Sequence, residues 1–65
     1  MYVARDKDGR LFLYFTKPSK IGIFDRWCSV NSRPNDYYEI DSSLFPEVKW
    51  EDEEPTEVEL VKKED

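Results

Sequence analysis

This chain cannot form an intrachain disulfide bond and has almost no ligands for a structural metal site, and this restricts the folds open to it more than any other feature. It has 65 residues, a single cysteine (Cys28) and no histidine. An intrachain disulfide is therefore impossible, and a structural zinc site has almost no ligands to draw on. A domain this short buries only about 60% of the surface that its unfolded chain exposes. Stability must come from efficient apolar burial, to which a homodimer could add.

Aromatic side chains are the main resource for such burial. Each can bury about 150–250 Å², so a few of them suffice for a small core. Their mixture with Val and Ile favours strands over helices. The ten aromatic residues are Tyr2, Phe12, Tyr14, Phe15, Phe24, Trp27, Tyr37, Tyr38, Phe45 and Trp50.

The clearest local signal is Asp8-Gly9, which lies between two segments of β-type sequence. An Asp-Gly pair predicts a hairpin with a type I′ turn, whose two central residues both need positive φ. The later segment Ile21–Val30 does not alternate cleanly, so we expect a bulge or loop near Gly22 or Asp25-Arg26. The expected strands are Met1–Arg5, Arg10–Thr16, Ile21–Val30, Tyr37–Asp41 and Thr56–Val61.

These segments predict a mainly β fold, either a small antiparallel meander or a partly open barrel of about five short strands. One short helical turn is expected near Ser42–Phe45, because Asp41-Ser42-Ser43 can cap it and Pro46 prevents a longer helix. Residues 1–61 are expected to form a single domain, and Lys62–Asp65 to fray.

The segment Leu44–Leu60 is expected to close the sheet. Leu44 and Phe45 would plug one end of the core, and Glu51–Glu54 would form an acidic turn. Val48 and Trp50 would point the same way in an extended segment. The residues expected to face the core near this end of the chain are Tyr38, Ile40, Val48, Trp50, Val58 and Leu60.

Charge is distributed unevenly along the chain. Residues 1–33 hold seven Lys and Arg against three Asp and Glu, a net charge of +4, whereas residues 34–65 hold three against twelve, a net charge of −9. We favour the interpretation that the two halves complement each other in the fold. The alternative is that the acidic half meets a basic partner.

The sequence offers little for catalysis or cofactor binding. Without histidine there is no Ser-His or Cys-His pair, and Cys28 beside Trp27 is typical of a small core residue. Neighbouring carboxylates in Glu51–Glu54 would alternate in direction along an extended segment and would not converge on a metal ion. We therefore predict a protein that is not an enzyme, with no cofactor, no catalytic residues and no metal site.

The composition also bears on location. Residues 1–10 are charged and do not resemble a signal peptide, and no apolar run approaches the length of about 20 residues that a membrane helix needs. With one cysteine, a reducing, cytoplasmic compartment is the expectation, and no membrane contact is expected.

Protein binding is the predicted function, with an unknown partner or a second copy of the chain. An exposed sheet edge, either Met1–Arg5 or Thr56–Val61, could accept another strand. Tyr37 and Trp50 adjoin polar segments and could be half exposed, and the acidic residues would face a basic partner. The predicted partner-binding residues are Tyr37, Trp50, Glu51, Asp52, Glu53, Glu54, Glu57 and Glu59.

Two other functions stay open. The acidic half could mimic a nucleic acid and inhibit a nucleic-acid-binding protein. A small metal-dependent enzyme is the other alternative, and it would need carboxylates that converge in a concave site. Direct nucleic-acid binding is not expected, because the net charge of the chain is −5 and nucleic-acid-binding proteins usually present a dominant basic face.

Both ends of the chain carry a resemblance. Met1–Asp6 with Asp8-Gly9, and Leu44–Val48 with Trp50–Pro55 and Glu57–Leu60, are similar to segments of small uncharacterised proteins encoded in bacterial chromosomes and their prophages. The resemblance implies no activity and no site residues. It favours a bacterial or phage accessory protein.

Overall fold

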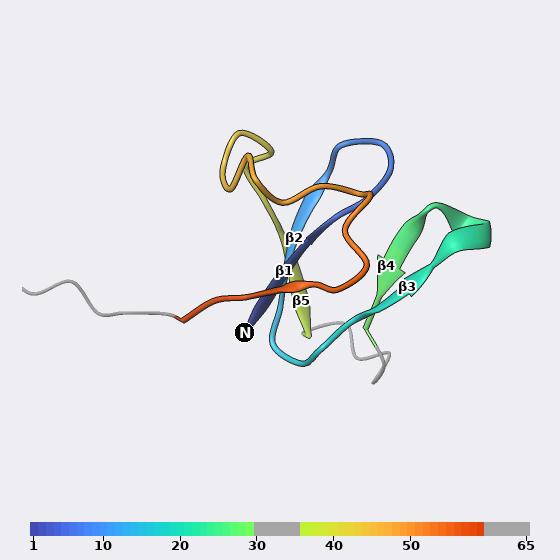
Figure 1. Ribbon diagram of the computed structural model, residues 1–65. Helices are drawn as coiled ribbons and strands as arrows, with labels where there is room; N and C mark the ends of the chain where they lie inside the picture. Colours follow the sequence, from blue (N-terminus) through green and yellow to red (C-terminus); the bar gives the residue numbers. More distant parts are fainter. Residues whose placement is uncertain (30–35, 60–65) are drawn as a thin grey trace, which may run out of the picture.

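The structure is a computed structural model that describes residues 1–29 and 36–59, and it is mainly β, as predicted. Six short strands pair into an antiparallel four-stranded sheet and a two-stranded hairpin, and the larger sheet does not close on itself (Figure 1). The elements are β1 (Tyr2–Arg5), β2 (Leu11–Tyr14), β3 (Ser19–Ile21), the 3₁₀ turn η1 (Gly22–Phe24), β4 (Arg26–Cys28), β5 (Tyr37–Ile40) and β6 (Thr56–Glu57).

The larger sheet has the strand order β5-β2-β1-β6, so β1 lies in its interior. The expectation that Met1–Arg5 forms an edge is therefore wrong, whereas β6 does lie at one edge. The other edge is β5. Expected strand residues 30, 60 and 61, and the tail 62–65, lie outside the described residues.

The turn between β1 and β2 differs in length from the predicted two-residue turn. The Asp6 amide donates to the Arg10 carbonyl at 2.9 Å, which leaves a three-residue loop, Lys7–Gly9. Gly9 has φ +94°, whereas Asp8 does not have positive φ. A type I turn followed by a glycine of positive φ is the usual form of a three-residue hairpin loop.

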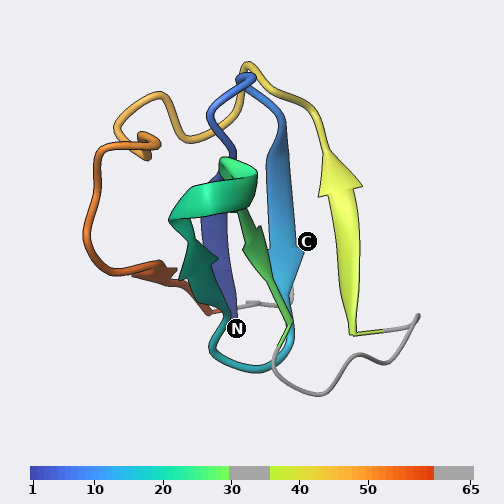
Figure 2. The ribbon, with the colours of Figure 1, turned by 90° about the vertical axis from the view of Figure 1, so that its right-hand side faces the viewer.

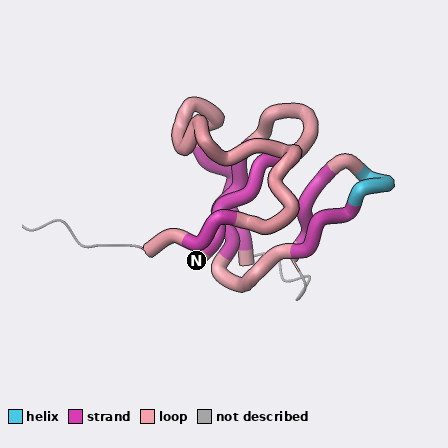
Figure 3. The backbone as a smooth tube through the Cα atoms, viewed as in Figure 1, coloured by secondary structure: helices cyan, strands magenta, loops and turns pink. Residues whose placement is uncertain are grey.

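The expected strand Ile21–Val30 is divided between two strands. β3 and β4 form a hairpin around η1, and Asp25 closes that turn in the left-handed conformation with φ 55°. The break falls between Gly22 and Asp25, within the stretch where the irregular alternation predicts it. Figure 3 shows η1 at the far tip of this hairpin.

Each face of the four-stranded sheet carries its own small core. On the loop face, which the chain between β5 and β6 covers, Val3, Leu11 and Val48 are buried and Phe45 packs against them. Val58 also packs there. Leu44, expected to plug this end, is instead 48% exposed.

On the hairpin face, Trp27 of β4 packs against Ala4 and Tyr14. Trp50 also packs against this cluster, so Trp50 and Val48 do not point the same way, contrary to expectation. The chain from Val48 to Trp50 is not a regular strand, and a turn begins at Trp50 and Glu51. Figure 2 shows the hairpin lying in front of the sheet, with β5 beside it.

The expected helical turn near Ser42–Phe45 is absent, and Arg5 binds this segment instead. Its guanidinium donates to the carbonyl oxygens of Ser42, Leu44 and Phe45 at 3.0–3.2 Å. It also donates to those of Val48 at 2.7 Å and Gly9 at 2.8 Å. A continuing helix would need an amide at Pro46 to bond to the Ser42 carbonyl, and proline has no N–H to donate. The segment forms hydrogen-bonded turns instead, and Phe45 has φ 48°.

We predict that Arg5→Lys destabilises the fold by about 2–3 kcal/mol, because an ammonium group cannot reach five carbonyls in a planar fork. Equilibrium unfolding in urea measures the loss. The matched control is Arg10→Lys, whose exposed guanidinium pairs only loosely with Asp8, at 3.6 Å, and it should change stability by less than about 0.5 kcal/mol. Equal stabilities for both variants would contradict this role of Arg5.

Candidate functional site

A cleft of about 590 Å³ lies on the hairpin face, between β4 and β5 and above β2. In Figure 2 the green β4 and the yellow β5 stand on either side of the light-blue β2. The cleft exists because the short hairpin covers only part of the sheet. Its lining residues are Asp6, Arg10, Phe12, Tyr14, Arg26, Trp27, Cys28, Ser29, Tyr37 and Glu39.

One end of the cleft is aromatic. Tyr37 contacts Phe12 edge-on, with ring centroids 5.9 Å apart, and Tyr14 at 5.7 Å. The register that pairs Tyr14 with Tyr37 and Phe12 with Glu39 puts these side chains on the same face. Tyr14 is buried, whereas Tyr37 is 43% exposed. Tyr37 therefore offers most of the accessible aromatic surface at this end.

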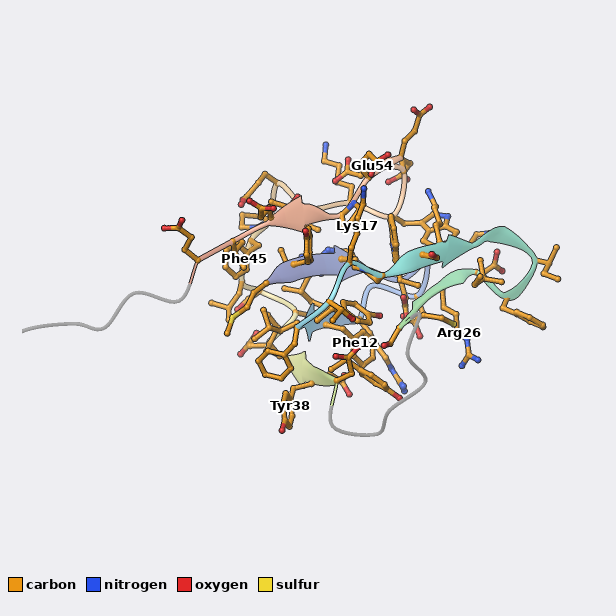
Figure 4. All side chains as sticks on the ribbon, turned by 90° about the horizontal axis from the view of Figure 1, so that it is seen from below. Phe12, Lys17, Arg26, Tyr38, Phe45 and Glu54 are labelled. Atoms are coloured by element: carbon orange, nitrogen blue, oxygen red, sulfur yellow. The ribbon has the colours of Figure 1, made fainter. Side chains whose placement is uncertain are left out.

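The other end of the cleft is charged. Arg10 and Glu39 come from the sheet side and Arg26 from the hairpin. The Arg26 guanidinium lies 5.9 Å from the centroid of the Phe24 ring and forms no ion pair within the described part of the chain. It can therefore receive a carboxylate from a bound molecule. Figure 4 labels Phe12, which comes from β2, and Arg26, which comes from β4.

Asp6 and Tyr14 attach β4 to the sheet. The Asp6 carboxylate accepts the Trp27 amide at 2.9 Å, and the Tyr14 hydroxyl donates to the Trp27 carbonyl at 3.3 Å. Burial raises the pKa of the Asp6 carboxyl, although the hydrogen bond from Trp27 opposes the effect, and burial likewise raises the pKa of Tyr14. The middle residue of β4 therefore has no backbone group left for another strand.

Asp36, which precedes β5, links the ends of β2, β4 and β5 at the aromatic end of the cleft. Its carboxylate accepts hydrogen bonds from Thr16 Oγ1 at 2.7 Å and from Ser29 Oγ. Its carbonyl accepts the Phe15 amide at 3.0 Å, which extends the pairing of β2 with β5. These bonds fix the spacing of β4 and β5 at this end of the cleft.

The structure does not bring the predicted partner-binding residues together. Tyr37 lies in the cleft on β5, whereas Glu57 lies on β6 at the opposite edge of the sheet. Tyr38, expected to face the core, is 53% exposed because it lies on the edge strand β5. Figure 4 shows Tyr38 pointing away from the body of the protein.

Trp50 is engaged within the fold. The Lys20 ammonium lies 4.2 Å from the centroid of the Trp50 ring and 5.8 Å from that of Trp27. It also donates to the carbonyl oxygens of Trp50 and Asp52, the latter at 3.1 Å. A cation–π contact of this kind covers the indole face that a partner would otherwise use.

The acidic corner has mixed surroundings. Glu54 pairs with Lys17 at 3.1 Å, and Figure 4 shows the two side by side. The Asp52 carboxylate accepts the Lys49 amide at 3.1 Å. The basic and acidic halves thus contact each other in two ways. Lys17 forms an ion pair with Glu54, and Lys20 donates hydrogen bonds to backbone carbonyls of the acidic half. Four further glutamates of the predicted set are exposed, namely Glu51, Glu53, Glu57 and Glu59.

Other kinds of site find little support. Within residues 1–29 and 36–59, no three Cys, Asp or Glu side chains gather as they would around a metal ion. The same residues include no helix with the length and apolar character to cross a membrane. Comparison with known proteins gives no relative, because no protein family, curated protein or solved structure matches the chain.

We predict that Asp6→Asn removes part of the pH dependence of stability. Burial raises the pKa of Asp6 above its ordinary 3.8 in the folded state. Its contribution is therefore fully present below pH 3.8 and is lost as pH rises through the raised pKa. Asparagine keeps an acceptor for the Trp27 amide without the charge. Relative to wild type, the variant should gain free energy of unfolding as pH rises through this window.

Urea unfolding of both proteins across this pH range measures the effect. Glu47→Gln is the control, because Glu47 has an exposed side chain and is not among the charges that shift the pKa of Asp6. An Asp6→Asn variant whose difference from wild type stays constant with pH would contradict the prediction.

Proposed function

We propose that the protein is a non-enzymatic accessory domain that binds an extended, apolar segment of a partner protein in the cleft between β4 and β5. The half-exposed ring of Tyr37, held by Phe12 and Tyr14 at the aromatic end, carries this proposal. Aromatic residues at such positions supply contact area with little loss of conformational freedom, which is why they dominate binding surfaces.

The size of the cleft supports an extended occupant. Its walls are strands of three and four residues, and four residues of extended chain span about 13 Å. A volume of about 590 Å³ falls within the range of known ligand sites. A short peptide segment with one apolar side chain at the aromatic end fits these dimensions.

The charged end supports a preference for an acidic residue in that segment. Arg26 can form a bidentate pair with a carboxylate, and it has no such partner in the described residues. We therefore expect an apolar residue followed or preceded at short distance by Asp or Glu. We further propose that the protein acts in a reducing compartment such as the bacterial cytoplasm, where Cys28 stays a thiol.

We predict that peptides selected from a random linear library on the wild-type protein will bind the Tyr37→Ser variant at least about tenfold more weakly than they bind wild type. The reason is that an aromatic anchor contributes more than about 1.4 kcal/mol. Calorimetric titration of the best selected peptide measures the loss. Tyr38→Ser is the matched control, because this neighbouring tyrosine lies on the opposite face of the same strand. It should bind the peptide as wild type does.

Cys28 gives an independent measurement, because it lines the cleft and is the only cysteine in the chain. Bound peptide should slow its alkylation by iodoacetamide. If no peptide is enriched, or if Tyr37→Ser and Tyr38→Ser weaken binding equally, the cleft is not the recognition site.

A second candidate function is inhibition of a nucleic-acid-binding protein through the acidic residues. It is supported by the exposure of Glu51, Glu53, Glu57 and Glu59, none of which forms an ion pair with another described residue. An array of free carboxylates near one sheet edge can attract a basic groove over several ångströms.

This second candidate predicts that the wild-type protein displaces a host protein from immobilised duplex DNA, as a competitor for its basic surface. Replacement of all four glutamates by glutamine should abolish the displacement, and raised salt should weaken it. Glu47→Gln, an exposed change outside this set, serves as the control. Displacement that survives the four substitutions would rule out the mimic.

A further inference from the structure

The outer edge of β5 has no paired strand among the described residues. β5 pairs with β2 on one side, and no other described segment pairs with its other side. The Phe15 amide donates to the Asp36 carbonyl, so in the alternating antiparallel pattern Tyr38 and Ile40 also bond inward. The amides and carbonyls of Tyr37 and Glu39 therefore point outward.

The other sheet edge is better protected than this one. β6 has only two residues and carries the exposed Glu57, which are two of the ways in which natural sheets discourage pairing. β5 is longer, with four residues, of which only Glu39 is charged. Of the two edges of the four-stranded sheet, the β5 edge is the more suited to accept a partner strand.

Exposed aromatic rings flank the β5 edge on the loop face. Phe15 and Tyr38 are 42% and 53% exposed and contact each other edge-on, with centroids 5.7 Å apart. Tyr38 lies on the edge strand itself, so an added strand would cover part of both rings. A partner that places another aromatic ring beside Tyr38 would extend this pair.

We propose that the occupant of this edge is a second copy of the chain, paired antiparallel through β5 with Tyr38 on the two-fold axis. Tyr37 of each copy then lies opposite Glu39 of the other, and their outward amides and carbonyls bond across the seam. The two Tyr38 side chains meet at a closely spaced, non-hydrogen-bonded position. Phe15 and Tyr38 of both copies form one row of four rings on the loop face.

Charge selects this register over the neighbouring ones. A two-fold axis at Glu39 would set two Glu39 carboxylates directly opposite each other, which is destabilising. An axis at Ile40 would set Glu39 opposite Asp41. An axis at Tyr37 would pair Glu39 with position 35, beyond the strand. Only when Tyr38 lies on the axis do the amides and carbonyls of Tyr37 and Glu39 all form hydrogen bonds across the seam while no two carboxylates lie opposite each other.

This pairing goes beyond the proposed peptide binding and does not depend on it. The four-stranded sheets of the two copies would join into one continuous sheet of eight strands. The axis is perpendicular to that sheet, so both hairpins and both clefts would lie on the same side. A partner with two suitable segments could then bind to both clefts, with a gain in avidity.

Disulfide trapping tests the register directly. Tyr37→Cys, Tyr38→Cys and Glu39→Cys are each made in a Cys28→Ser background and oxidised gently. Residues at a non-hydrogen-bonded pair have Cα atoms about 4.5 Å apart, within disulfide range, whereas diagonal pairs lie about 7–8 Å apart. The Tyr38→Cys protein should form covalent dimers at least about tenfold faster than the other two.

Sedimentation of the wild-type protein provides a second measurement that needs no substitution. It should show reversible self-association that grows with concentration, and Tyr38→Glu should abolish it, because two carboxylates would meet on the axis. Glu57→Gln, at the opposite edge, should leave it unchanged. A wild-type protein that stays monomeric at all concentrations, or faster trapping at position 37 or 39, would overturn the proposal.

Discussion

The guanidinium of Arg5 is the interaction on which the loop face depends. It satisfies carbonyl oxygens from four residues of the segment between β5 and β6 and one from the first hairpin turn. That segment has no regular secondary structure to use its own backbone groups. Because a carbonyl taken out of water without a partner is costly, the bonds from Arg5 to the partly buried carbonyls of Phe45 and Val48 allow an irregular chain to seat these two residues on the sheet.

The sheet is thus covered on both faces by different means, and the difference accounts for the position of the cleft. On the loop face the cover is a long segment fixed by Arg5. On the hairpin face it is two short strands attached through Trp27 to Asp6 and Tyr14. The hairpin is too narrow to reach β5, so aromatic side chains of β2 and β5 stay accessible beside it. The two proposals use different sides of β5, since the cleft lies on its hairpin face and the copy–copy pairing uses its edge.

Local pattern was enough to predict much of the fold, because strand periodicity and turn chemistry are local properties. The hairpin at Asp8-Gly9, the break near Gly22 and the antiparallel β character all follow from short stretches of sequence. Strand order does not, since the pairing of β5 with β2 joins residues far apart in the chain. Tyr38 was expected inside because its strand was not known to lie at an edge. Trp50 was expected to face the core or to be half exposed, but its contact with Lys20 could not be predicted because Lys20 comes from thirty residues earlier. The cleft was missed for the same reason, although Tyr37 was among the predicted residues.

The contacts of Arg5 also bear on how the chain reaches this structure. Arg5 and its acceptors beyond the first hairpin are 37 to 43 residues apart in the sequence. Their meeting must therefore close a long loop, at an entropic cost that no local turn offsets. A small protein rich in such distant contacts folds more slowly than a helical one of equal size. Before that closure the guanidinium can bond only the Gly9 carbonyl of its own hairpin, so its other donors are left to water.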